Sequence, residues 1–216
     1  MNKKIKICGL TKKREFDLAI SLSLDFVGIV FHKPSIRYIK PEKISVILNQ
    51  LEIKLKLIAV VVNPSDKDLE NILNNIPLFG IQMHGNETVE RIKEVKKRTN
   101  LQIIKAIPIG DKRDINFAKK FEDVSDMLLF DSKPGINSKS PGGNAKAFDW
   151  NLLIEQEWEK PWFLSGGLDI NNINNALNIT KADYCDVSSG VEVVKGKKDL
   201  NLMKIFTKKV REFNNV

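Results

Sequence analysis

Short runs of apolar residues alternate along this chain with longer segments in which apolar residues recur every three or four positions. The runs have the length of strands, and a continuous run such as residues 25–31 (DFVGIVF) is typical of a parallel strand buried on both faces. The longer segments have the spacing of amphipathic helices, as in residues 69–76 (LENILNNI). We therefore predict that strands and helices alternate along the chain.

The pattern predicts eight strands, at residues 4–7, 25–31, 55–63, 79–85, 101–109, 126–131, 161–167 and 182–190. Helices are expected after Thr11, at 42–51, around 69–76, at 86–98, at 114–122, after Trp150, at 170–179 and at 199–213. Eight such units favour an α/β fold, a single (β/α)8 TIM barrel that forms one domain from residues 1–216. An open doubly wound sheet is the alternative, but its usual Gly-rich first turn is missing here.

Composition narrows the possible partners. The formal net charge is +8, which fits a nucleic-acid partner, an anionic small molecule or a Lys-rich solvated surface. No aromatic residues are interleaved with the helical lysines as a base-stacking surface needs, so we expect no nucleic-acid partner. The sequence has neither a long apolar run nor a secretory apolar core, so we expect a cytoplasmic protein without membrane association. A disulfide between its two cysteines is not expected there.

Polar residues occur where the predicted strands end. In a closed barrel the carboxyl ends of the strands meet at one mouth, where active sites are built. We therefore predict one polar site from the residues at these ends: Cys8, His32, Asn63, His84, Asp131, Ser165 and Asp186.

Three of these residues are candidates for proton transfer. Cys8 is a candidate base or nucleophile, although free cysteine is more often a small buried apolar residue. Asp131 is a candidate acid or base, and His84 is either an acid or base or a supporting hydrogen-bonding group. Strand alternation turns Cys185 away from Asp186 and toward the helices, so we interpret Cys185 as structural.

Two turns of small residues follow the last two predicted strands, in SGGLD (165–169) and DVSSG (186–190). Such turns expose backbone N–H groups, and barrels commonly bind phosphate after strands seven and eight. The predicted phosphate-binding residues are Gly166, Gly167, Ser188, Ser189 and Gly190, with ordinary tight turns as the alternative.

Arg37, in the loop after the second strand, could bind a carboxylate through two hydrogen bonds or lie on the surface. The chain has no HExxH motif, no clustered Cys and His residues and no dinucleotide-binding fingerprint. We therefore expect neither a metal nor a nicotinamide.

Taken together, the segments resemble the phosphoribosylanthranilate isomerase family of tryptophan biosynthesis. The matching segments are KICGLT (6–11), DFVGIVFHKPSIRYI (25–39), VVNPS (61–65), IQMHGNE (81–87), LLFDSKPG (128–135), AFDW (147–150), LSGGL (164–168), DVSSGVE (186–192) and GKKD (196–199). They occur in the order of the family across nearly the whole chain, and the family fold is a single (β/α)8 barrel.

The resemblance implies an Amadori rearrangement of N-(5-phosphoribosyl)anthranilate to the carboxyphenylamino-deoxyribulose phosphate, without a cofactor. It assigns Cys8 as general base and Asp131 as general acid, and it assigns Arg37 to the anthranilate carboxylate. The two small-residue turns match the phosphate site. His84 and Asp186 match polar groups near the substrate.

Cys8 must be a thiolate to remove a proton, so a lowered thiol pKa would help near neutral pH. Lys6 faces the same side of the first strand and is a candidate for that lowering; the alternative is a barrel lysine paired with an acid. The loop after the sixth strand departs from the family, because PGGNAKAFDW has Asn144 and Ala145 where a second glycine before lysine is usual. We expect this loop, 132–147, to fold over the substrate.

Two other functions remain open at this point. One is a different phosphate-binding barrel enzyme, such as a sugar-phosphate epimerase, in which Cys8 would be idle. The other is a non-catalytic basic binding protein. We expect a monomer or a homodimer.

Overall fold

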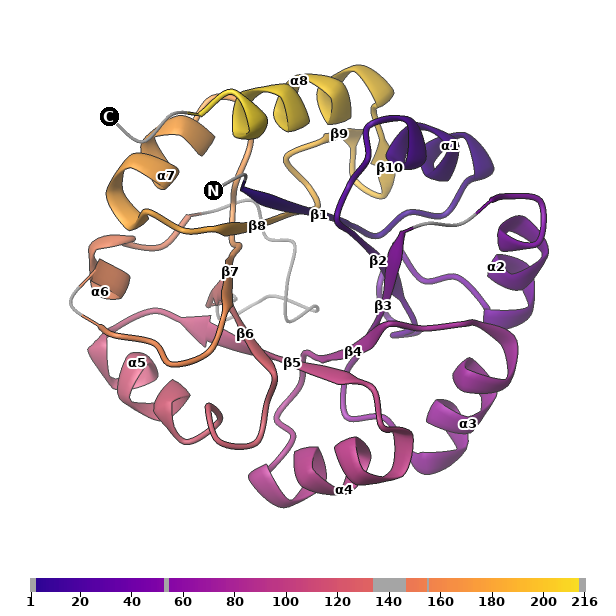
Figure 1. The fold of residues 1–216 in the computed structure, drawn as a ribbon, viewed down its shortest axis with the longest axis horizontal. Helices are drawn as coiled ribbons and strands as arrows, with labels where there is room; N and C mark the ends of the chain where they lie inside the picture. Colours follow the sequence, from indigo (N-terminus) through magenta and orange to yellow (C-terminus); the bar gives the residue numbers. More distant parts are fainter. Residues whose placement is uncertain (1–2, 53–54, 134–146, 155, 214–216) are drawn as a thin grey trace.

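Eight parallel strands close into a barrel in chain order, with the helices outside it (Figure 1). The structure is a computed structural model that describes residues 3–52, 55–133, 147–154 and 156–213. The strands are β1 Lys4–Cys8, β2 Phe26–Val30, β3 Lys56–Val61, β4 Gly80–Met83, β5 Gln102–Ile109, β6 Met127–Ser132, β7 Trp162–Leu164 and β8 Tyr184–Val187. Pairing of β1 with β8 closes the ring, which confirms the predicted barrel and rules out the open sheet.

The helices are α1 Lys13–Ser21, α2 Pro41–Leu48, α3 Asp66–Asn75, α4 Val89–Thr99, α5 Lys112–Lys119, α6 Asn151–Ile154, α7 Ile173–Thr180 and α8 Leu200–Arg211. All eight predicted helices are present, but several ends differ. Helix α7 begins three residues later than predicted. Asp169 Oδ1 accepts the N–H groups of Asn171 and Asn172, at 2.7 and 3.0 Å, and so holds a separate turn ahead of the helix.

A short antiparallel hairpin follows β8, where the apolar pattern predicts no strand. It consists of β9 Glu192–Val194 and β10 Lys197–Lys198, with Gly196 in the turn at φ 81°. A residue without a side chain adopts this left-handed conformation without strain. In the hairpin Lys198 pairs with Glu192, which places opposite charges next to each other.

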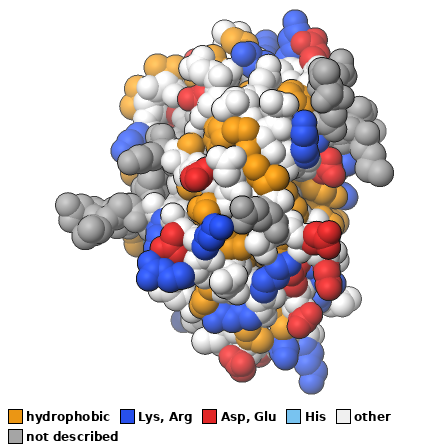
Figure 2. Space-filling view, turned by 90° about the vertical axis from the view of Figure 1, so that its left-hand side faces the viewer, with side chains coloured by type: hydrophobic (Ala, Val, Ile, Leu, Met, Phe, Trp, Pro, Cys, Tyr) orange, Lys and Arg blue, Asp and Glu red, His pale blue; other side chains and the backbone are white. Residues whose placement is uncertain are grey.

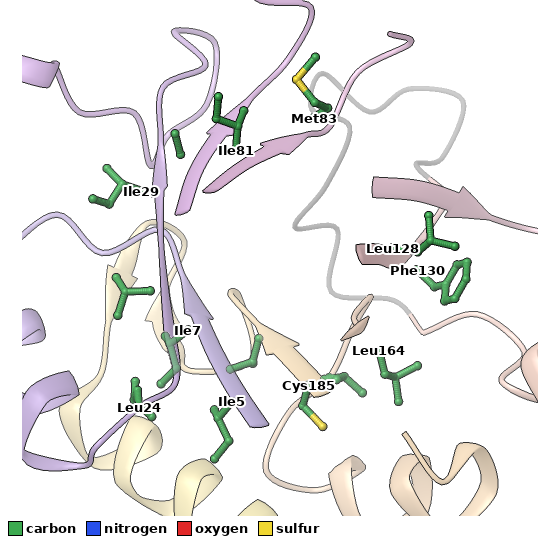
Figure 3. Packing of buried hydrophobic residues seen from close by; sticks show 14 of the residues in the cluster. Ile5, Ile7, Leu24, Ile29, Ile81, Met83, Leu128, Phe130, Leu164 and Cys185 are labelled. Atoms are coloured by element: carbon green, nitrogen blue, oxygen red, sulfur yellow. The ribbon is translucent and has the colours of Figure 1, made fainter. Parts of the chain in front are cut away.

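Apolar side chains form two layers around the barrel wall. The larger layer lies between the strands and the helices, and Figure 3 shows part of it, including Ile5, Ile7, Leu164 and Cys185. The smaller layer fills the barrel interior and consists of Phe26, Ile58, Ile104, Ala106, Met127, Leu129 and Phe163. The interior is therefore packed and not a pore, so a ligand must bind at its open end.

Cys8 belongs to a third, smaller group with Val30 and Val60, above the interior layer. Its neighbour across the sheet is Gly28. A Cβ at Gly28 would lie 2.7 Å from Cys8 Sγ, so the glycine provides the space that the thiol occupies. The segment DFVGIVF therefore forms β2 and, through Gly28, also leaves room for the Cys8 side chain of β1.

The face shown in Figure 2 has Lys, Arg, Asp and Glu side chains interspersed among apolar ones. The positive net charge is not concentrated into a single basic field on this face. Within the described ranges, no helix combines the length and the apolar character that crossing a membrane requires. Most of the loop predicted to fold over the substrate, residues 134–146, lies outside the described residues.

Candidate active site

A pocket lies at the carboxyl ends of the barrel strands. Its lining includes most of the predicted site residues: Cys8, His32, Arg37, His84, Asp131, Ser165, Gly166, Gly167, Asp186, Ser188 and Ser189. Val30, Ser35, Val60, Val62, Gln82, Leu168 and Val187 complete the wall. The structure thus brings together residues from both halves of the chain, as the strand-end pattern predicted.

Asn63 and Gly190 are the two predicted residues that do not line the pocket. Asn63 Oδ1 accepts the N–H of Asn86 at 2.9 Å and so joins two neighbouring loops. Gly190 packs so closely on the loop after β7 that a Cβ there would lie 1.8 Å from the carbonyl oxygen of Leu168. Both residues shape the loops around the site without facing the cavity.

Cys8 is 7% exposed and ends β1 in the wall of the pocket. Burial raises the pKa of its thiol above the ordinary value, because a thiolate loses solvation there. The cations of Lys6, Lys198 and Arg37 act in the opposite direction but do not outweigh burial. The lowered pKa that would help this thiol act as a base is therefore not found, although Lys6 does act in the direction expected of it.

Lys6 is fully buried inside the barrel, one pleat below Cys8. Its Nζ donates to Oδ1 of Asp186 at 2.9 Å. Burial alone would lower the pKa of Lys6, but the charges of Asp186 and Cys8 together raise it. The lysine is thus a paired core cation that also faces the thiol. Ser165 Oγ, 3.4 Å from the other Asp186 oxygen, joins the pair to the loop after β7.

Asp131, His84 and Gln82 form a chain of contacts on the far side of the pocket. His84 Nε2 lies 3.3 Å from Asp131 Oδ2, and Gln82 Nε2 lies 2.8 Å from His84 Nδ1. Gln82 thus contacts one ring nitrogen of His84, and the other ring nitrogen faces the Asp131 carboxyl group. The backbone N–H of Ser132 donates to Asp131 Oδ1 at 2.8 Å. This arrangement fits the second of the two roles expected for His84, that of a supporting hydrogen-bonding group, and the role itself stays a prediction.

The turn that presents His84 is held from behind by a buried ion pair. Lys105 Nζ donates to Glu87 Oε2 at 2.7 Å and to the carbonyl oxygen of Gly85 at 2.6 Å. Glu87 in turn accepts the N–H of Gly85 with both oxygens, at 2.9 Å each. Both polar groups of Gly85 are thus hydrogen-bonded, which restrains the backbone directly after His84.

Arg37 is only 7% exposed, which excludes the surface interpretation. Its Nε and Nη2 donate to Glu192 Oε1 and Oε2, both at 2.8 Å. Lys198 Nζ donates to Glu192 Oε1 at 2.6 Å. Burial would raise the pKa of Glu192, but these two cations together bring it down to about 2. Glu192 is thus a permanent anion between two cations.

The two small-residue turns flank the pocket on the side of β7 and β8. Gly166 and Gly167 both adopt positive φ, 80° and 67°. To other described residues, the N–H groups of Gly166, Gly167, Ser188 and Ser189 donate no hydrogen bonds. Successive N–H groups without a partner among the described residues suit an oxyanion.

The hydroxyl of Ser188 has a different partner. Its Oγ donates to the carbonyl oxygen of Cys8 at 3.0 Å and accepts from Lys198 Nζ at 3.2 Å. The hydroxyl proton is therefore committed to the backbone of β1. Only the N–H of Ser188 remains for the predicted contact with a phosphate.

Sequence reasoning missed Gln82 as a pocket residue, and it missed the pairing of Glu192 and Lys198 with the site. Period-two alternation could have identified Gln82, which shares a face of β4 with His84. Opposite charges on either side of the glycine in VEVVKGKKD indicate a hairpin, and that signal was present. Across the described part of the chain, no three His, Cys, Asp or Glu side chains gather as ligands for a metal ion.

Comparison with known proteins gives a consistent result. The family model described as "N-(5'phosphoribosyl)anthranilate (PRA) isomerase" matches residues 5–209. The chain is 40% identical to N-(5'-phosphoribosyl)anthranilate isomerase of Paracoccus denitrificans (strain Pd 1222) over 202 residues, 94% of each chain. It is 37% identical to the protein of that name from Zymomonas mobilis (strain ATCC 31821 / ZM4 / CP4) over 212 residues, 98% of this chain and 99% of the relative.

Solved structures agree. Phosphoribosyl anthranilate isomerase from Thermotoga maritima superposes with a TM-score of 0.86 at 30% identity, covering 97% of this chain and 98% of that one. A phosphoribosyl anthranilate isomerase in complex with reduced 1-(o-carboxyphenylamino)-1-deoxyribulose 5-phosphate has a TM-score of 0.83 at 29% identity, with the same coverage. The chain therefore belongs to the N-(5'-phosphoribosyl)anthranilate isomerase family, as a (β/α)8-barrel isomerase of tryptophan biosynthesis.

Proposed function

We propose that residues 1–216 form one catalytic domain that isomerises phosphoribosylanthranilate, with Asp131 as general acid and Cys8 as general base. The observation that carries this assignment is the pocket itself, which is lined by both a carboxyl group from β6 and a thiol from β1. General acid–base catalysis needs both groups within reach of a single substrate.

In the first step Asp131 donates its proton to the ring oxygen of the ribose. The bond from that oxygen to C1′ breaks, its electron pair stays on the oxygen, and the nitrogen lone pair forms an iminium with C1′. His84 contributes by holding the Asp131 carboxyl through Nε2, at 3.3 Å. Gln82 fixes the ring that does so.

In the second step the Cys8 thiolate removes the C2′ proton. The electrons of the C–H bond form the C1′–C2′ double bond, and those of the C–N double bond return to nitrogen, which gives an enolamine. Tautomerisation of the enolamine then yields the ketone. No electrons enter or leave, and the iminium itself activates the proton, so the reaction needs no cofactor.

Two anionic groups of the substrate have complementary partners. Arg37 suits the anthranilate carboxylate, because a guanidinium binds a carboxylate through two parallel hydrogen bonds. The N–H groups of Gly166, Gly167, Ser188 and Ser189 suit the phosphate. Gly190 supports the same turn from behind. Asp186 acts through Lys6 and Ser165, beside the thiol.

The test is the loss of anthranilate fluorescence when purified protein is mixed with freshly prepared phosphoribosylanthranilate. Asp131→Asn should lower kcat by about 10²–10⁴, the usual effect of losing a general acid. Arg37→Ala should mainly raise KM. Wild-type turnover by Asp131→Asn would overturn the acid assignment, and an unchanged KM for Arg37→Ala would overturn the carboxylate assignment.

The oligomeric state, the cellular location and the absence of nucleic-acid or membrane binding remain predictions. One solved relative is described as a dimeric phosphoribosylanthranilate isomerase from Thermotoga maritima, and for this chain we propose a monomer or a homodimer, to be decided by light scattering. We likewise propose a cytoplasmic enzyme that binds neither nucleic acid nor membrane.

A further inference from the structure

The hairpin β9–β10 contributes a carboxylate to the site that none of the assigned chemistry uses. Glu192 accepts four hydrogen bonds: from Arg37 Nε and Nη2 at 2.8 Å, from Gly196 N–H at 2.9 Å and from Lys198 Nζ at 2.6 Å. Its side chain is 2% exposed. A carboxylate with every lone-pair direction engaged has no capacity left for proton transfer or for a ligand, so its role must lie in what it holds.

Glu192 binds one edge of the Arg37 guanidinium, the edge formed by Nε and Nη2. A guanidinium has five N–H groups, and Glu192 takes the one on Nε and one on Nη2. The end of the group, with Nη1 and the second N–H of Nη2, is engaged by no other described residue. This end is itself a fork that fits a carboxylate, in the plane that Glu192 imposes.

The charges in the cluster lead to the same conclusion. Arg37 and Lys198 are cationic and Glu192 is anionic, so one positive charge is left in a nearly dry environment. Lys198 is almost fully buried, and its Nζ is committed to Glu192 and to Ser188. The excess charge is therefore available only at Arg37, and one carboxylate from the substrate would neutralise the cluster.

We propose that Glu192, supported by Lys198 across the hairpin, is a positioning residue that presents the end of Arg37 to the substrate carboxylate and so determines selectivity for that group. The inference rests on the proposed role of Arg37. The hairpin is placed to position Arg37, because its turn at Gly196 packs against the loop that contains this arginine. A Cβ at Gly196 would lie 3.3 Å from the carbonyl oxygen of Ile36.

The experiment compares two ligands by titration calorimetry. One is the reduced product analogue, 1-(o-carboxyphenylamino)-1-deoxyribulose 5-phosphate in its reduced form, and the other is the same compound without the carboxylate. The quantity of interest is the Kd of the ligand without the carboxylate divided by the Kd of the carboxylate ligand. Glu192→Gln keeps the size of the side chain but offers only one acceptor oxygen. It should weaken binding of the carboxylate ligand by about 10- to 100-fold, the scale of a misplaced binding group, and leave the other ligand nearly unchanged.

Controls separate positioning from folding. Lys197→Gln removes an exposed charge from β10, the partner strand in the hairpin, and should leave the ratio at the wild-type value. Glu192→Asp keeps the charge and should restore part of the ratio. In an Arg37→Lys background, Glu192→Gln should have no further effect. If Glu192→Gln fails to fold, Lys198→Met, which loosens Glu192 without removing it, should lower the same ratio by a smaller factor.

Equal weakening of both ligands, or an unchanged ratio in a folded Glu192→Gln protein, would overturn the inference. Failure of the proposed function would be seen differently: the wild-type protein would not turn over phosphoribosylanthranilate at all. A wild-type ratio near one would contradict the proposed role of Arg37 and the inference together.

Discussion

The two faces of the barrel wall each contain one buried cysteine, and burial raises the thiol pKa of both, but their surroundings differ. Cys8 faces the pocket, with Lys6, Arg37 and Lys198 close enough to stabilise a thiolate. Cys185 is one strand away on β8 and faces outward, among the aliphatic side chains of Figure 3. The pKa of its thiol is raised to about 12, chiefly by burial. Residue type and burial therefore do not distinguish the two thiols, whereas the three cations that act on Cys8 do.

The same contrast applies to buried lysines. Lys6 pairs with Asp186 inside the barrel and acts on the thiol, whereas Lys105 pairs with Glu87 in the outer layer and holds a turn. The buried ion pair on the inner face thus lies where its field reaches the pocket. The buried ion pair on the outer face instead stabilises a loop. Substitutions matched across the wall should separate these two uses.

The largest expected effect comes from replacing the thiols. Cys8→Ala should lower kcat by about 10²–10⁴, because the reaction loses its base. Cys185→Ala should leave kcat within about a factor of two, since its side chain belongs to the apolar layer between strands and helices and does not line the pocket. The fluorescence assay under saturating substrate measures both. Comparable losses for the two variants would refute the contrast between the faces.

The next effect concerns Lys6. Lys6→Met leaves Asp186 as an uncompensated buried anion, so the protein should lose about 3–5 kcal/mol of stability to urea. The pKa of Cys8 should rise further, because the ammonium group that lowers it is gone. Since the base acts as a thiolate, kcat/KM should already increase with pH from neutral into the alkaline range. In Lys6→Met this increase should move to higher pH.

Lys3→Met is the matched control for that shift. Lys3 is another buried lysine, and it acts on Cys185 and not on Cys8. Its partner Asp183 is exposed, so no buried charge is stranded. The pH profile of kcat/KM should coincide with that of the wild type. A shift of the same size in both variants would mean that the profile reports overall charge and not the local field of Lys6.

The smallest effect is on the outer face. Cys185→Ser places a hydroxyl among aliphatic side chains, and an unpaired buried hydroxyl costs about 1–3 kcal/mol of unfolding free energy. Urea unfolding monitored by tryptophan fluorescence measures it. Cys8→Ser should cost less, because polar and charged groups surround that position. The opposite order would show that the outer position has a polar partner.

Much of the fold was predictable, because barrel units repeat a local pattern. The run in residues 25–31 predicted β2, and the stripe in residues 69–76 predicted α3. The ends were less accurate. Helix α7 starts late because a side chain, Asp169, holds a competing turn, and the apolar pattern does not reveal the β9–β10 hairpin, although GKKD is one of the family segments. The loop at 134–146 stays a prediction.

For the site, the order of the amino acids alone specifies which residues end the strands, and parallel strands in a closed barrel must bring those ends together. That is why the pattern of strand ends placed Cys8, His84, Asp131 and Asp186 in one pocket, although Asn63 from the same pattern does not line it. The partners and the charge of these residues arise only from the folded chain. The pairs Lys6–Asp186 and Arg37–Glu192 join residues far apart in the sequence. The pKa of Cys8 depends on the balance between burial and the charges of residues that are distant in the sequence. Both are known only once the chain has folded.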